Sequence, residues 1–231
     1  MTWLPGLAND RRLTEDAAGL SAYPAFFLHF FSSMATFPLT SPERHPHGPA
    51  NAEHELKKAY DSVIEAGVTH FWDRHAVPGV YPFEAVTLYK LAFDAYRNRD
   101  RLAAERWARS VKHLTRAYWH EAKIAYLQPR TAELPFLKDA YEEYGLREGI
   151  DTTADLLNCV ASHIPPGLTE MPEEMKRFLL RGRKHLDALN DPGTQHELLR
   201  TEHIKAAHEY GRVLECMALA YEAEAQRPKA A

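Results

Sequence analysis

The stretches "FEAVTLYKLAFDAYRNRD" (residues 83–100) and "LAAERWARSVKHLTRAYWHEAKIAYL" (residues 102–127) decide the fold class. In both, apolar residues recur every three to four positions, which is the period of an amphipathic helix. A polar break near Asp100 separates the two stretches. The sequence therefore predicts two long helices joined by a short turn, an αα-hairpin.

The same period continues along most of the chain, whereas alternating runs of β-branched residues are missing from the sequence. The sequence therefore predicts a single all-α domain over residues 1–231, a bundle of about seven to nine helices. Further helices are predicted from Thr14 onward with a break at Pro24, over 52–67 with Gly67 as the C-cap, and over 133–145, 152–164, 165–189 and 194–225.

Charge and cysteine content exclude several classes of protein. A net charge of −4 and a pI near 6.4 leave no basic excess for binding nucleic acid through its phosphates. Cys159 and Cys216 stand far apart in the sequence, so neither a disulfide framework nor a cysteine zinc site is predicted. The apolar stretch 23–37 is too short and interrupted to span a bilayer, and the start of the chain does not resemble a secretory signal. We therefore expect a cytoplasmic protein without a transmembrane segment.

Thirteen histidines are the unusual feature of the composition, and histidine is the commonest metal ligand. His113 and His120 stand seven residues apart on one face of a predicted helix. His203 lies in the apolar row of the last helix with Glu202 beside it, and His29 lies among phenylalanines. These residues are candidate metal ligands, with Glu202 as a carboxylate at the same centre. The alternative is that each ring bonds a neighbouring polar group in the core or at the surface.

Five further histidines are predicted to be surface or capping residues. His196 falls in the same apolar row as His203. The surface or capping set comprises His45, His47, His54, His163 and His185.

The string "THFWD" (residues 69–73), followed by the helix "LAFDAYRNRDRLAAERWARSVKHL", resembles the zinc-dependent phospholipase C and S1/P1 nuclease superfamily. The resemblance covers about residues 55–121. It implies an all-α zinc enzyme in which His29, His70 and His113 are ligands and Asp61 or Glu55 is a bridging carboxylate. Ala117 and Lys123 stand where the family has an aspartate and a histidine, which implies one or two metal ions rather than three.

A metal-dependent hydrolase acting on a phosphoester of a small or lipid-like molecule is the leading prediction. A divalent ion, zinc before iron, would activate a water molecule, and Asp73 would orient the imidazole of His70. In the alternative interpretation of this string, Phe71 and Trp72 fill the core while His70 and Asp73 cap a helix end. Two other functions stay open: a non-haem iron oxidase that uses inward His and Glu residues, and a non-catalytic helical interaction protein. A homodimer is a further expectation.

Overall fold

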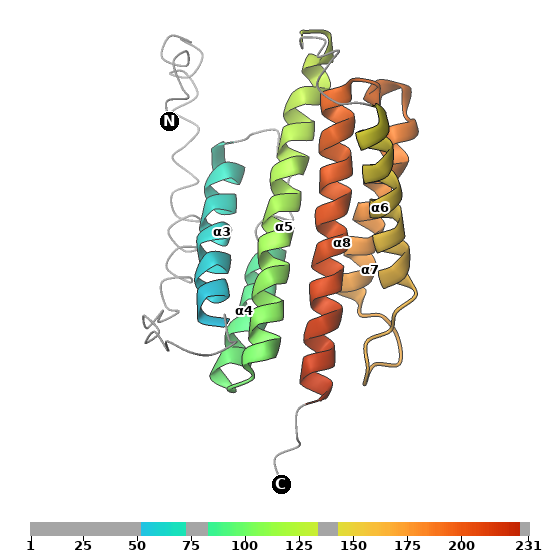
Figure 1. Cartoon of the computed structure of the whole chain (residues 1–231). Coiled ribbons are helices and arrows are strands. Elements are labelled where there is room, and N and C mark those ends of the chain that lie inside the picture. Colours follow the sequence, from blue (N-terminus) through green and yellow to red (C-terminus); the bar gives the residue numbers. More distant parts are fainter. Residues whose placement is uncertain (1–51, 73–82, 134–142, 227–231) are drawn as a thin grey trace. The chain divides into compact units, whose positions relative to one another are not determined.

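The computed structural model describes residues 52–72, 83–133 and 143–226, without the side chains of 68–72, 133 and 143–148 (Figure 1). Contacts along the chain separate residues 1–46 from residues 47–231, and every described residue lies in the second part. The prediction of one domain over the full chain therefore stays a prediction.

The described residues form six α-helices and contain no strand, which confirms the all-α prediction for this part of the chain. The total of seven to nine helices for the whole chain stays a prediction. The helices are α3 (Ala52–Trp72), α4 (Phe83–Arg97), α5 (Arg101–Leu127), α6 (Glu143–Ala161), α7 (Glu173–Asp187) and α8 (Glu197–Ala225). Short 3-10 helices follow at η2 (Gln128–Glu133), η3 (Ala188–Asn190) and η4 (Pro192–Thr194).

The two longest helices, α5 and α8, lie side by side at the centre of the described bundle (Figure 1). Helices α3 and α4 pack on α5, whereas α6 and α7 pack on α8. Trp107, Leu114, Tyr210 and Leu214 are among the fully buried side chains of this central pair. Full burial of one such leucine contributes about 1.5–3 kcal/mol. Helices α5 and α8 carry the most buried residues of the described helices, so they contribute most to the core.

The predicted αα-hairpin is confirmed in α4 and α5. The side chain of Asp100 caps α5 by accepting a hydrogen bond of 3.1 Å from the backbone N–H of Ala103. Arg99 adopts a left-handed conformation, with φ at 61°, and closes the end of α4. The backbone N–H of Asp100 reaches back to the carbonyl of Ala95, the pattern of a Schellman cap.

Three predicted boundaries are wrong. Helix α7 begins at Glu173, although the sequence predicted a helix from residue 165. Helix α3 continues through the buried Gly67 to Trp72, so residues 69–72 of the "THFWD" string form its last turn. Helix α6 runs unbroken over Glu143–Ala161, although the sequence predicted a break after Gly145. Helix α6 approaches α8 closely at Gly211, where an added Cβ would lie 2.7 Å from the side chain of Leu156. Neither Gly67 nor Gly145 ends its helix, although glycine is a weak helix former. None of the described helices is both long and apolar enough to cross a membrane.

Candidate functional site

The interface between α5 and α8 pairs histidines with glutamates in a repeating pattern. His113 Nδ1 lies 2.5 Å from Glu209 Oε2, and His120 Nδ1 lies 2.6 Å from Glu202 Oε2. Both histidines and both glutamates are seven residues apart, and the helices run antiparallel, so the same contact recurs after two turns. We call these two contacts the seam pairs.

Each glutamate of the seam pairs also approaches a cation on α5. Arg116 Nη1 lies 4.0 Å from Glu209 Oε1, and Lys123 Nζ lies 3.7 Å from Glu202 Oε1. Because each cation follows its histidine by three residues, the unit of histidine, glutamate and cation repeats as a whole. Burial raises the pKa of both glutamates, but the hydrogen bonds from the histidines and the nearby positive charges together hold each pKa below its ordinary value. Both carboxylates are therefore ionised at neutral pH.

A second cluster lies where α7 meets α5 and α8. His185 Nδ1 on α7 and His203 Nδ1 on α8 are 3.1 Å apart. On the other side of its ring, His185 Nε2 lies 3.1 Å from Glu121 Oε1 on α5. The hydroxyl of Tyr210 donates a hydrogen bond of 2.7 Å to the same carboxylate oxygen. We call His185, His203, Glu121 and Tyr210 the imidazole cluster.

An ion pair between α4 and α7 extends this polar interior. Arg181 Nη1 donates to Glu84 Oε2 over 2.8 Å, and the hydroxyl of Tyr118 donates to the same oxygen over 2.8 Å. Burial, together with the neighbouring glutamates, raises the pKa of both Tyr118 and Tyr210 well above the ordinary value. Both hydroxyls therefore stay protonated and act as donors, which ties four helices together through hydrogen bonds in the core.

The facing Nδ1 atoms of the two imidazoles lie within hydrogen-bond distance, and the tautomer of each ring decides which of them donates. When His185 donates its Nε2 proton to Glu121, its Nδ1 carries a lone pair directed at His203. His203 can then donate from its own Nδ1. Burial and the adjacent His185 lower the pKa of His203 to about 4, so His203 is neutral at neutral pH. This contact differs from the seam pairs because each imidazole faces a ring nitrogen instead of a carboxylate oxygen. Both ring nitrogens can bind a metal ion.

The structure separates the predicted metal ligands. His113 and His120 lie two turns apart, about 10.5 Å along the helix, which is too far for both to bind one ion. His203 belongs to the imidazole cluster, whereas Glu202 pairs with His120. Asp61 is exposed and forms an ion pair with Lys57 on its own helix.

Glu55, the alternative bridging carboxylate, is buried on α3, and its Oε2 lies 2.6 Å from Lys112 Nζ on α5. His29 and Asp73, the residue predicted to orient His70, lie outside the described residues, and so does the side chain of His70 at the end of α3. Within the described ranges, no three His, Cys, Asp or Glu side chains are arranged to hold one metal ion. The ligand set predicted from the sequence is therefore not assembled in this part of the chain.

One histidine prediction is wrong. His185 was expected at the surface or as a cap, but its side chain is only 12% exposed. Its spacing of seven residues from the buried Phe178 marks the inward face of α7 and is the signal that sequence reasoning missed. His196, which falls in the apolar row of the sequence, caps α8: its Nδ1 accepts a hydrogen bond from the backbone N–H of Leu198, and its Nε2 is buried. Glu121 and Tyr210 were also missed as members of a site.

Comparison with known proteins adds no relative: no family model, curated protein or solved structure matches the chain. The resemblance to the phospholipase C and nuclease superfamily therefore stays a prediction from the sequence.

Proposed function

We propose that the protein binds a divalent metal ion between α7 and α8, and that it is a metal-dependent hydrolase acting on a phosphoester. The observation that carries the proposal is the facing pair of Nδ1 atoms of His185 and His203, 3.1 Å apart, with Glu121 on the far side of the His185 ring. In this proposal the ion replaces the proton of the hydrogen bond between the two nitrogens.

The surroundings of His185 match those of a metal-ligating histidine. Such a histidine usually donates its other ring N–H to a carboxylate, which fixes the tautomer and the orientation of the ring. Glu121 occupies that position, and Tyr210 in turn holds the Glu121 carboxylate. Imidazole nitrogen suits zinc, with iron as the alternative.

The number of protein ligands favours an open site. Two imidazoles are fewer protein ligands than the four of a structural zinc site or the three of a catalytic one, so water and substrate would fill the remaining positions. A bound divalent ion would lower the pKa of a water ligand and polarise a phosphoryl oxygen. The chain's own part is to orient His185 through Glu121 and to present a neutral His203.

The test is a zinc titration of protein purified without a histidine tag and stripped with a chelator, followed by calorimetry. We expect one equivalent of zinc to bind the wild-type chain, and His185→Ala or His203→Ala to bind at least roughly tenfold more weakly. His163→Ala is the matched control, because His163 pairs with Glu222 at the surface. Zinc-dependent cleavage of bis(p-nitrophenyl) phosphate tests the reaction. No zinc binding, or equal binding by all variants, would overturn the metal site, whereas binding without cleavage would overturn only the hydrolase.

The second candidate is a non-catalytic helical protein whose histidines hold its helices together. It is favoured by the seam pairs, in which each imidazole already faces a carboxylate. In that case none of the histidine variants changes metal content. An iron oxidase would instead yield protein with bound iron and a visible charge-transfer absorption. A small or lipid-like substrate, a homodimer and a cytoplasmic location stay predictions.

A further inference from the structure

The C-terminal half of α5 and the 3-10 helix η2 that follows it present two rows of side chains. One row is basic and consists of Arg116 and Lys123 on α5 and Arg130 on η2, each seven residues apart in the sequence. The other row is aromatic and consists of Trp119 and Tyr126, also seven residues apart. We call these five residues the α5 basic face. Trp119 and Tyr126 are 50% and 51% exposed, and the Arg116 side chain is 58% exposed.

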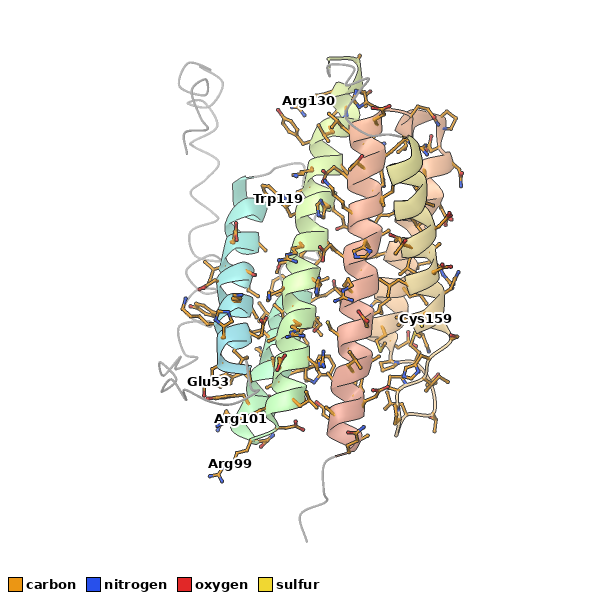
Figure 2. The ribbon with its side chains drawn as sticks, viewed as in Figure 1. Glu53, Arg99, Arg101, Trp119, Arg130 and Cys159 are labelled. Carbon is orange, nitrogen blue, oxygen red and sulfur yellow. The ribbon has the colours of Figure 1, made fainter. Side chains whose placement is uncertain are left out.

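The rows contact each other at the surface. Lys123 Nζ lies 5.4 Å from the centre of the Trp119 ring, and the Arg130 guanidinium lies 4.0 Å from the centre of the Tyr126 ring. Such cation–π contacts stabilise the position of each cation beside its aromatic ring. Helix α3 ends near the level of Trp119, whereas α5 continues beyond it to Leu127 and is followed by η2, which carries Arg130 (Figures 1 and 2). The upper part of the α5 basic face is therefore not covered by α3.

We propose that the α5 basic face docks an acidic amphipathic helix of a partner protein. The seven-residue spacing of both rows is the repeat with which one helix packs along another at a small crossing angle. Exposed tryptophan, tyrosine and arginine are the side chains that most often contribute large binding energies at interfaces. A partner helix with apolar residues beside a row of glutamates would contact both rows at once.

The charges decide between the occupants. Arg116, Lys123 and Arg130 would face the same cations in a symmetric pairing with a second copy, and like charges in contact are unfavourable. Glu202 and Glu209 lie beside Lys123 and Arg116, and the chain carries a net charge of −4, which weakens attraction for a continuous run of phosphates. Because Arg116 and Lys123 already face these glutamates, contact with the exposed Trp119 and Tyr126 contributes most to the docking of a partner helix. Spaced acidic residues of the partner add to it at Arg130 and at the exposed sides of the other two cations. This proposal is independent of the metal site.

The probe is a fluorescein-labelled helical peptide of three heptads, with Glu at every seventh position beside a row of leucines. We expect saturable binding in fluorescence anisotropy that weakens as salt rises, since part of the attraction is between exposed charges. Trp119→Ala with Tyr126→Ala, and separately Lys123→Gln with Arg130→Gln, should each weaken binding by roughly tenfold or more. Arg99→Gln with Arg101→Gln is the matched control, because both arginines are exposed at the opposite end of α5 (Figure 2).

The following outcomes would overturn the proposal. The peptide does not bind, both face variants bind as the wild type does, or a peptide with Lys in place of Glu binds equally well. A face that binds an oligo-dT strand or phosphatidylserine vesicles but not the peptide would have a different occupant. If Trp119→Ala with Tyr126→Ala abolishes self-association in analytical ultracentrifugation, the occupant is a second copy of the chain. Circular dichroism of each variant confirms that the helices persist, so that lost binding reports on the face.

Discussion

The seam pairs and the imidazole cluster use the same residue types on adjacent faces of α8, yet they form different kinds of contact. In the seam pairs each imidazole faces a carboxylate, as in His113–Glu209. In the imidazole cluster His185 faces a second imidazole, that of His203. A carboxylate that faces an imidazole accepts a hydrogen bond from it, whereas between two facing imidazoles one nitrogen lone pair accepts the proton of the other ring, a proton that a metal ion can replace. The partner of each histidine, rather than histidine content, distinguishes a structural contact from a candidate ligand.

The largest expected effect comes from breaking a seam pair. His113→Ala leaves the part-buried Glu209 without its closest partner, and losing a hydrogen bond to a charged group costs about 1.5–3 kcal/mol of unfolding free energy. Urea denaturation measures the change, and His113→Gln is the control because it keeps a donor. Zinc affinity should stay unchanged. Weaker zinc binding by correctly folded His113→Ala would place this histidine at the metal site and erase the distinction between the two regions.

A smaller effect is expected from the carboxylate of the imidazole cluster. Glu121→Gln keeps the size of the side chain and an acceptor for Tyr210, but it no longer offers a carboxylate to His185. Zinc affinity should fall by roughly ten- to a hundredfold, the usual effect of such an orienting group. Calorimetric titration provides the measurement. Unchanged affinity would show that Glu121 does not orient a ligand.

The pH dependence of the unfolding free energy tests the seam pair of Glu209. The pKa of Glu209 is lower in the folded protein than the ordinary value of 4.5. The unfolded chain therefore binds more protons in this range, and the unfolding free energy falls as pH drops below 4.5 toward the folded pKa. Glu209→Gln removes this titration, so its unfolding free energy should vary less with pH in that window. A profile as steep as that of the wild type would contradict the assigned pairing with His113.

The smallest effect is expected for the exposed histidine–carboxylate pair. His163 Nε2 lies 2.9 Å from Glu222 Oε1, but the His163 side chain is 47% exposed. Exposed ion pairs contribute about 0–1 kcal/mol, so His163→Ala should change the unfolding free energy by less than about 0.5 kcal/mol. A loss comparable with that of His113→Ala would show that burial does not set the strength of these pairs.

Periodicity predicted the helices well because the apolar rows of α5 and α8 are long and regular. It also placed His113, His120 and His203 on inward faces, where the structure has them. It could not assign their partners, because contacts between helices depend on register, and register is not encoded in the pattern of one helix. Asp61 was predicted as a bridging carboxylate from the family resemblance alone. The resemblance carried no information about burial, and the side chain is exposed.

Nitrogen-15 NMR of the histidine rings tests the central claim most directly, because it reports the protonation and ligation of each Nδ1. With rings assigned through His185→Ala and His203→Ala, addition of one equivalent of zinc should move the Nδ1 resonances of His185 and His203 to the range of metal-bound nitrogen. The Nδ1 resonances of His113 and His120 should keep their zinc-free positions, since they face Glu209 and Glu202. Zinc that leaves the cluster resonances unmoved, or that moves those of the seam pairs instead, would contradict the account.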